Sequence, residues 1–254
     1  MSVMQPRLTQ APPRACPVVW CAILVVSLLA GAAPAAQAVP AREARFAKER
    51  DAMVRLIEKN GVRDSATLAA LRSVPRHRFV PEEHLGRAYG DHPLPIGYGQ
   101  TISQPYIVGY MTELLGPRPG MRVLEVGTGS GYQAAVLAAI GCRVYTVEIF
   151  EALASSSRRR LRELGYASVT VRHGDGNEGW PEEAPFDAII VTAAAGYIPP
   201  KLIEQLHPRG RLLIPVGSVY GVQNLILVEK DAKGRARTQS LLPVRFVPML
   251  SGLR

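Results

Sequence analysis

Glycines near the middle of the chain have the spacing needed to bring a backbone against a ligand. Gly127, Gly129 and Gly131 stand at alternate positions directly after an apolar run at residues 123–126. Glycine lets a backbone approach a ligand closely, and the helical pattern at residues 132–139 offers free N–H groups at its start. The stretch therefore predicts the first strand, loop and helix of a nucleotide-binding sheet. A purely structural tight turn is the alternative.

The order of these glycines indicates which ligand is bound. Dinucleotide-binding loops follow G-x-G-x-x-G, whereas this loop reads G-T-G-S-G and follows a strand that carries Glu125. That variant is typical of S-adenosylmethionine (SAM) methyltransferases, in which the loop packs against the amino-acid end of the cofactor. The next apolar run, residues 143–147, ends in Glu148. An acidic residue at this place is expected to bind ribose hydroxyls.

Two later strand ends also carry groups suited to a ligand. Asp175 precedes Gly176 and follows a strand predicted at residues 168–172, where its carboxylate could accept the amino group of an adenine. An aspartate that only stabilises a turn is the alternative. The strand predicted at residues 186–192 opens onto small alanines at 193–195, which leave room at the carboxyl edge of the sheet.

A loop before the glycine-rich stretch carries two hydroxyl side chains. Residues 89–104 contain too many glycines and prolines for a helix, and Thr101 and Ser103 lie just ahead of a helix predicted at residues 106–115. Hydroxyls and free N–H groups at the start of a helix form a suitable site for a carboxylate. A simple N-cap role for Ser103 is equally compatible with the spacing.

The order of predicted elements gives the fold class. Helical patterns occupy residues 41–71, with a break at Gly61, and strands and helices alternate after residue 122. The remaining helices are predicted at residues 82–89, 151–164 and 199–206, and the remaining strands at residues 210–215, 224–229 and 240–246. We therefore predict an α/β protein with a Rossmann-like, doubly wound sheet of seven strands and helices on both faces. Five strands are parallel, an antiparallel pair lies at one edge, and an N-terminal helical extension lies on the substrate side.

The N-terminus differs from the rest of the chain. Arg7 and Arg14 precede an apolar run at residues 18–33, and the A-Q-A triplet at residues 36–38 resembles a cleavage site. These are the three regions of a secretory signal peptide, with an apolar core too short for a comfortable membrane span. We predict a leader at residues 1–38 and a single domain at 39–254. Residues 39–118 would supply the N-terminal helices and the substrate loop, and residues 119–254 the cofactor-binding sheet and the C-terminal strands.

The composition restricts the classes of partner. The chain has 254 residues and a formal net charge of +9. Its basic runs also carry acidic residues or lie on predicted helix faces, and no aromatic residues alternate with the charges, so we expect no nucleic-acid binding. After loss of the leader Cys142 is the remaining cysteine, and we expect a buried, inert thiol there. The histidines are scattered, so we predict no metal site.

The motifs together resemble the protein-L-isoaspartate (D-aspartate) O-methyltransferase family. The resemblance extends over residues 44–253. It rests on the runs PRHRFVP at residues 75–81, LPIG at 94–97, GQTISQP at 99–105, EVGTGSGYQ at 125–133, GDG at 174–176, APFDAIIVTAA at 184–194 and VRFVP at 244–248. The glycine loop alone indicates a methyltransferase, whereas the GQTISQP loop selects this family.

The resemblance implies a reaction and a set of residues. Members methylate the α-carboxylate of isoaspartyl residues in damaged proteins, and the ester closes to a succinimide whose hydrolysis returns part of the material to aspartate. The resemblance implies that Ser103 is the active-site serine and that Thr101, Ile102, Gln104, Ala193, Ala194 and Val247 bind the substrate. It implies that SAM is bound by Glu125, Gly127, Thr128, Gly129, Gly131, Glu148, Asp175 and Gly176. Tyr98 and Ile149 depart from the pattern, which expects a more polar residue and an arginine there.

Two other functions remain open from the sequence. One is a SAM methyltransferase that acts on RNA or a small molecule, which the basic charge favours. The other is an exported, non-catalytic module that binds carboxylate segments, which the leader favours because SAM is made in the cytosol. The same conflict leaves the compartment open between the cytoplasm and the periplasm or exterior. We expect a monomer.

Overall fold

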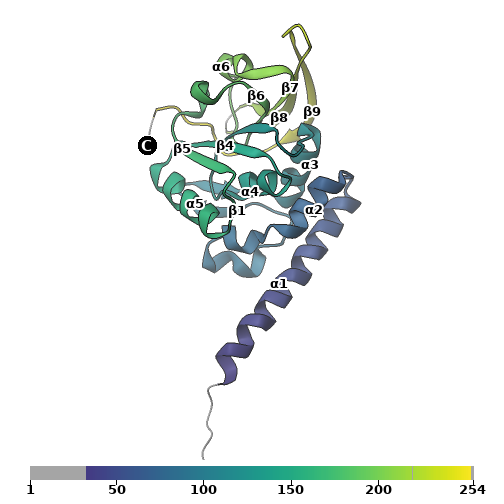
Figure 1. Cartoon of the computed structure of the whole chain (residues 1–254), viewed down its shortest axis with the longest axis vertical. Helices are drawn as coiled ribbons and strands as arrows, with labels where there is room; N and C mark the ends of the chain where they lie inside the picture. The colour runs from purple at the N-terminus through teal and green to yellow at the C-terminus, as the bar shows by residue number, and fades with distance from the viewer. Residues whose placement is uncertain (1–32, 219, 253–254) are drawn as a thin grey trace, which may run out of the picture. The chain divides into compact units, whose positions relative to one another are not determined.

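The body of the protein is built on one mixed sheet. The computed structural model describes residues 33–218 and 220–252, so most of the predicted leader lies outside the described residues. The sheet contains β3 (Arg122–Val126), β4 (Arg143–Glu148), β5 (Val169–His173), β6 (Phe186–Val191), β7 (Leu206–Gly217), β8 (Gln223–Lys230) and β9 (Ala236–Val244). Its strand order is β5-β4-β3-β6-β7-β8-β9. The first five strands in this order are parallel, and β8 runs antiparallel to both β7 and β9 (Figure 1).

The central strands are apolar on both faces, as expected for parallel strands covered by helices on each side. Val123 packs in one hydrophobic cluster and Leu124, its neighbour on β3, packs in another on the opposite face. On β6 Ile190 and Ile189 alternate in the same way. The predicted seven-stranded α/β fold is therefore confirmed.

Helices cover both faces of this sheet. The bounds are α1 (Ala33–Lys59), α2 (Ser65–Ser73), α3 (Pro105–Leu115), α4 (Tyr132–Ala139), α5 (Glu151–Glu163) and α6 (Pro200–Glu204). Phe46, Val54 and Ile57 bury one side of α1 in the same cluster as Val123, whereas Leu202 of α6 packs with Leu124. None of the described helices is both long enough and apolar enough to cross a bilayer.

Two segments differ from the sequence-based prediction in their details. The loop before α3 contains a two-stranded hairpin, β1 (Leu94–Gly97) and β2 (Gln100–Ile102), where irregular structure was expected. The backbone at its tip is left-handed at Gly97, Tyr98 and Gly99, with φ of +55° at Tyr98. The helix predicted at residues 199–206 ends at Glu204, because β7 begins at Leu206 and pairs there with Phe186.

A buried arginine joins the N-terminal segment to the sheet layer. Arg76, in the 3₁₀ turn Arg76–Phe79, is fully buried and donates from Nε to the carbonyl oxygen of Ala88 at 2.9 Å. Its guanidinium carbon lies 4.9 Å from the centre of the Tyr132 ring, at the start of α4. Burial lowers the pKa of Arg76 to about 10. A cation on an aromatic face is attractive, so this contact links the segment before α3 to the helix after the glycine loop.

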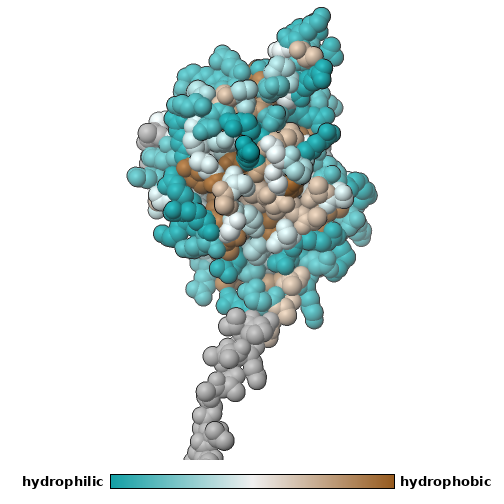
Figure 2. Space-filling model, viewed as in Figure 1, coloured by the Kyte–Doolittle hydropathy of each residue, from teal (hydrophilic) through white to brown (hydrophobic). Residues whose placement is uncertain are grey.

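The surface of the body is mixed in character. Figure 2 shows hydrophobic residues gathered in the middle of one face and surrounded by hydrophilic ones.

Cys142 is buried, as predicted, and burial raises the pKa of its thiol to about 11.

Candidate functional site

The glycine loop lies at the carboxyl end of β3 and is fastened to the neighbouring strands. The N–H groups of Gly127 and Thr128 both donate to the carbonyl oxygen of Val147, at 2.8 and 3.3 Å. The hydroxyl of Thr192 donates to the carbonyl oxygen of Gly127 at 2.7 Å. Gly127 has a φ of +100°, and a Cβ atom there would lie 2.6 Å from Thr192 Oγ1. Only glycine fits this turn without displacing Thr192.

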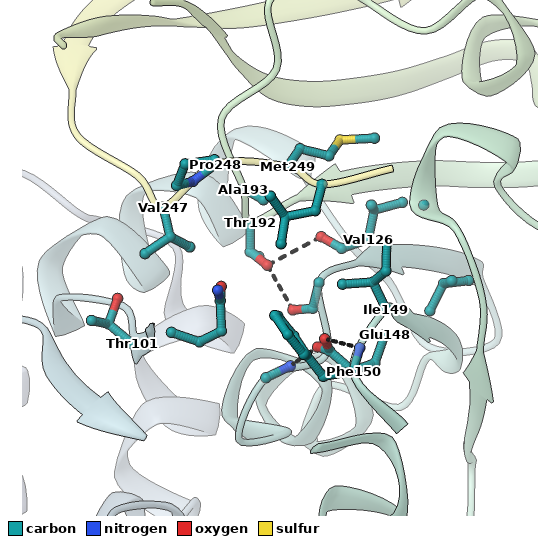
Figure 3. Close-up of a pocket in the computed structure, with 16 residues that line it drawn as sticks. Thr101, Val126, Glu148, Ile149, Phe150, Thr192, Ala193, Val247, Pro248 and Met249 are labelled. Atoms are coloured by element: carbon teal, nitrogen blue, oxygen red, sulfur yellow. Dashed lines mark hydrogen bonds between the residues drawn. The ribbon is translucent and has the colours of Figure 1, made fainter. Parts of the chain in front are cut away.

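Glu148, at the end of β4, is held against the loop by backbone donors. The N–H of Gly129 donates to its Oε2 at 2.7 Å, and the N–H of Phe150 donates to Oε1 at 3.1 Å. Burial raises the pKa of Glu148, while these hydrogen bonds act in the opposite direction. Each carboxylate oxygen keeps a lone pair free, so two ligand hydroxyls can still be bound. Figure 3 shows Glu148 beside the cavity.

Glu125 is a completely buried carboxyl group at the base of the loop. Its Oε2 accepts a hydrogen bond from the hydroxyl of Thr146 at 2.5 Å, and Thr146 lies 2.7 Å from the hydroxyl of Thr128. Its Oε1 has no partner among the residues that the structure describes. Burial raises the pKa of Glu125 to about 8. An unpartnered buried oxygen is costly, which suits a position that receives a donor from a ligand.

A cavity of about 530 Å³ opens beside these groups at the carboxyl edge of the sheet (Figure 3). It is lined by residues from β3 and β4, from the loops after β5 and β6, from the hairpin and from the C-terminal segment. They are Gln100, Thr101, Val126, Gly127, Gly129, Val147, Glu148, Ile149, Phe150, Gly176, Thr192, Ala193, Val247, Pro248, Met249 and Leu250. A smaller cavity of about 290 Å³ continues along the glycine loop to Glu125, Thr128 and Ser130.

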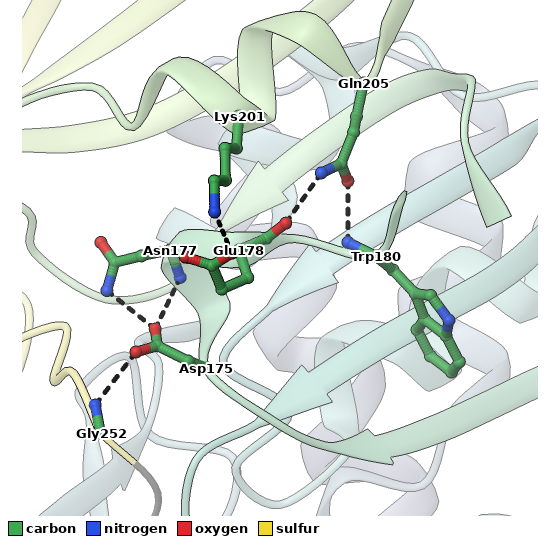
Figure 4. Close-up of polar contacts among 7 residues, drawn as sticks. All are labelled: Asp175, Asn177, Glu178, Trp180, Lys201, Gln205 and Gly252. Atoms are coloured by element: carbon green, nitrogen blue, oxygen red, sulfur yellow. Dashed lines mark hydrogen bonds and ion pairs between the residues drawn. The ribbon is translucent and has the colours of Figure 1, made fainter. Parts of the chain in front are cut away.

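The C-terminal segment forms one wall of the larger cavity. Ala194 donates from its N–H to the carbonyl oxygen of Val247 at 2.8 Å, and Met249 donates to the carbonyl oxygen of Ala194 at 2.7 Å. Asp175 holds the same segment further along, because its Oδ2 accepts from the N–H of Gly252 at 3.0 Å (Figure 4). Its Oδ1 accepts from the N–H and the side-chain amide of Asn177, both at 2.9 Å. Burial alone would raise the pKa of Asp175, but these hydrogen bonds outweigh it and lower the pKa.

A second space, a cleft of about 960 Å³, lies beside the end of the hairpin and the start of α3. Its lining residues are Pro93, Thr101, Ser103, Gln104, Ile107, Thr192, Val222, Pro243, Val244, Arg245 and Phe246. Arg245 is the one charged side chain in this lining. Thr101 and Thr192 line this cleft and both cavities beside the glycine loop. The three spaces therefore meet at these two threonines.

Ser103 lies in the cleft wall, two residues before the start of α3. The N-cap position belongs to Gln104, whose side chain makes no capping hydrogen bond. An N-cap role for Ser103, one of the two interpretations of the sequence, is therefore wrong.

The acceptor for the N–H of Tyr106, in the first turn of α3, is Asp91 Oδ1, at 2.8 Å. No local signal in the sequence pointed to Asp91, which lies fifteen residues before Tyr106.

Comparison with known proteins decides between the methyltransferase classes. A family model described as Protein-L-isoaspartate(D-aspartate) O-methyltransferase (PCMT) matches residues 48–254. The chain belongs to this family. A protein-L-isoaspartate O-methyltransferase 2 of Syntrophobacter fumaroxidans is 53% identical to this methyltransferase over 241 residues, which cover 91% of this chain and 97% of that protein. A protein-L-isoaspartate O-methyltransferase of Opitutus terrae is 54% identical over 228 residues, covering 89% and 95%.

A solved structure agrees with the fold of this methyltransferase. It is described as a protein-L-isoaspartate O-methyltransferase from Plasmodium falciparum in complex with S-adenosyl-L-homocysteine (SAH). It superposes with a TM-score of 0.70 at 25% identity and covers 79% of this chain and 98% of that one. The cofactor of the present protein is SAM. The residues fit this cofactor. Glu148 has free lone pairs for ligand hydroxyls, and Glu125 has an unpartnered oxygen. Gly176 keeps the wall of the cavity free of a side chain, because a Cβ atom there would lie 2.3 Å from Val126 Cγ1.

The predicted site residues of this methyltransferase separate into two groups. The structure brings most of them to the walls of the three spaces. The predicted residues that line these walls are Thr101, Ile102, Ser103, Gln104, Glu125, Gly127, Thr128, Gly129, Glu148, Gly176, Ala193 and Val247. Gly131 caps α4 behind the loop, Ala194 pairs its backbone with the C-terminal segment, and Asp175 holds that segment. The binding roles of all of these residues stay predictions.

Some lining residues of this methyltransferase were missed from the sequence. Thr192 ends the predicted fourth strand beside Ala193, so its place at the carboxyl edge of the sheet was a usable signal. Arg245 lies in the VRFVP run at residues 244–248 that carries the family resemblance, whereas Phe150 and Met249 offered no such signal. Within residues 33–218 and 220–252, no three histidine, cysteine, aspartate or glutamate side chains are grouped as metal ligands would be.

Proposed function

We propose that this methyltransferase transfers a methyl group from SAM to the α-carboxylate of L-isoaspartyl and D-aspartyl residues in damaged proteins, and so begins repair through a succinimide. The observation that carries the proposal is the shared lining of the cofactor cavity and the open cleft by Thr101 and Thr192. In this proposal the methyl group crosses from the cofactor cavity to the cleft beside these two threonines. The cleft is open, as access by a protein segment requires, and carries a single positive charge, Arg245.

Methyl transfer to a carboxylate requires the protein mainly to position the two reactants. An acceptor carboxylate is ionised at neutral pH, so no strong general base is needed. SAM, when bound, supplies a methyl group on a sulfonium. We assign to the hydroxyl of Ser103 and to N–H groups of its loop the task of orienting one carboxylate oxygen, so that the other points toward the cofactor cavity at Thr101. Holding reactants in line can contribute roughly 7–11 kcal/mol to a rate enhancement.

The test uses a pair of peptides that differ only in one linkage. The full chain is incubated with SAM labelled in the methyl group and either an isoaspartyl peptide or its normal aspartyl twin. We expect label on the isoaspartyl peptide alone. Equal labelling of both peptides, or labelling of RNA or a small molecule in place of either, would overturn the assignment of the acceptor.

The leader and the assembly state are proposals of the same kind. We infer that residues 1–38 form a removable leader, that residues 39–254 form one domain, and that the protein is a monomer. The leader favours export, whereas the cofactor supply favours the cytoplasm. N-terminal sequencing of the protein from fractionated cells tests the leader and the compartment together, and light scattering tests the monomer.

A further inference from the structure

The start of α3 needs hydrogen-bond acceptors that its own sequence does not supply. The first turn of a helix leaves N–H groups without partners inside the helix. Pro105, the first residue of α3, has no N–H, and the N-cap residue Gln104 makes no side-chain cap. The N–H of Tyr106 is therefore the first donor of the helix, and Asp91 Oδ1 accepts it at 2.8 Å.

The second oxygen of the same carboxylate holds the residue next to Ser103. Gln104 donates from its side-chain Nε2 to Asp91 Oδ2 at 2.9 Å. Asp91 thus binds residues on both sides of Pro105, and both contacts are partly buried. Hydrogen bonds to an ionised carboxylate are shorter and stronger than neutral ones. The position of the backbone that carries Ser103 is consequently tied to Asp91.

Asp91 can act in this way because its own segment is anchored. Arg76 Nε donates to the carbonyl oxygen of Ala88, and His77 Nδ1 lies 2.7 Å from the hydroxyl of Tyr89. Arg76 and His77 are both buried. Two buried side chains therefore fix the chain just before Asp91.

We infer that Asp91 is a positioning residue for methyl transfer: it holds Ser103 at the wall of the acceptor cleft through Gln104 and the N-terminus of α3. This inference rests on the proposed role of Ser103. Asp91 does not line the cofactor cavity or the acceptor cleft, so it acts through the loop and not on the reacting atoms.

The test compares two aspartates that both cap helices. Asp64 caps α2 by accepting from the N–H of Thr67 at 2.7 Å, far along the chain from Ser103. Asp91→Ala, Asp91→Asn and Asp64→Ala are made in the full chain. For each, the melting temperature, kcat and KM for an isoaspartyl peptide, and the Kd for SAH are measured.

We expect Asp91→Ala to lower kcat by roughly ten- to a hundredfold, because small misplacements of reacting groups are that costly. Its Kd for SAH should stay within about twofold of wild type, since the cofactor walls are untouched. Asp91→Asn should recover most of kcat, because its amide oxygen can accept from Tyr106 and the amide of Gln104 can turn to bind its nitrogen. Asp64→Ala should lower the melting temperature but leave kcat unchanged.

Several outcomes would overturn the inference. They are an unchanged kcat in Asp91→Ala, an equal loss of kcat in Asp64→Ala, a parallel loss of SAH affinity in Asp91→Ala, or no recovery in Asp91→Asn. Failure of the wild-type chain to methylate the isoaspartyl peptide is a different result, because it contradicts the proposed function before any variant is compared.

Discussion

The cofactor cavity and the acceptor cleft are built in different ways. The one charged side chain in the lining of the cofactor cavity, Glu148, comes from the carboxyl end of β4, and the backbone N–H groups of Gly129 and Phe150 hold it in place. The acceptor cleft is walled by the hairpin loop, the start of α3 and the segment after β9. Its geometry depends on a contact between distant residues, Asp91 and Tyr106. We call the cofactor cavity the cofactor half of the site and the acceptor cleft the acceptor half. The cofactor half is therefore positioned by the sheet, whereas the acceptor half is positioned by hydrogen bonds between segments far apart in the sequence.

The largest effect is expected from crowding the loop of the cofactor half. Gly127→Ala places a side chain at φ +100° and 2.6 Å from Thr192 Oγ1. Backbone strain of about 1–3 kcal/mol and the clash should together weaken SAH binding by about a hundredfold or more, as measured by calorimetry. Gly120→Ala is the matched control, because Gly120 has φ +86° but open space around its Cβ position. Similar SAH affinities in the two variants would show that the contact with Thr192 is irrelevant.

A smaller effect is expected at Glu148. Glu148→Gln keeps the shape but leaves one oxygen to serve two backbone donors, so the N–H of either Gly129 or Phe150 meets an amide nitrogen. Charge-assisted hydrogen bonds contribute about 1.5–3 kcal/mol, so the Kd for SAH should rise by roughly ten- to a hundredfold. Titration of the variant with SAH gives the number. In saturating SAM, kcat should change far less than Kd, and a loss confined to kcat would argue against a cofactor role.

The contiguous character of the cofactor half explains why it could be predicted from the sequence. The run from Glu125 to Gly131 contains a strand end, a loop and a helix start, and Glu148 follows on the adjacent strand. Local patterns fix both, because parallel strands bring their carboxyl ends to one edge. The seven strands were predicted from the same kind of local pattern. Errors remain at strand ends where the pairing extends beyond the apolar run: β7 begins at Leu206, which pairs with Phe186, four residues before the strand predicted at residues 210–215.

The acceptor half shows what local patterns do not contain. The sequence located Ser103 but not its support, since Asp91 acts across Pro105 through contacts that only the folded chain brings together. In the cofactor half, the sequence indicated Asp175 as an adenine contact but not that it also holds the C-terminal segment through Gly252; its role toward adenine stays a prediction. The hairpin was missed because its glycines and prolines, which indicate a loop, also permit the left-handed tip at Tyr98.

A different kind of effect concerns pH and the buried carboxyl of the cofactor half. The pKa of Glu125 is raised to about 8 from an ordinary value of 4.5, because burial disfavours its charged form. The folded state therefore holds this proton more tightly than the unfolded state. The stability that this contributes is complete below about pH 4.5 and is lost as the pH rises through about 8.

Urea denaturation between pH 5 and 9 checks this expectation. The unfolding free energy of wild type, relative to that of Glu125→Gln, should fall by up to about 1.4 kcal/mol per pH unit. Glu83→Gln, an exposed control, should follow wild type at every pH. A constant difference between wild type and Glu125→Gln across this range would contradict a buried, protonated carboxyl.

The most direct test of the division between the two halves is Ser103→Ala, with kcat on an isoaspartyl peptide and the Kd for SAH measured on the same preparation. Ser103 lines the acceptor cleft and the smaller cavity along the glycine loop, but not the larger cavity beside Glu148. We predict a kcat lowered by roughly tenfold or more with a Kd for SAH nearly unchanged. An equal loss of SAH affinity, or a kcat that does not change, would contradict it.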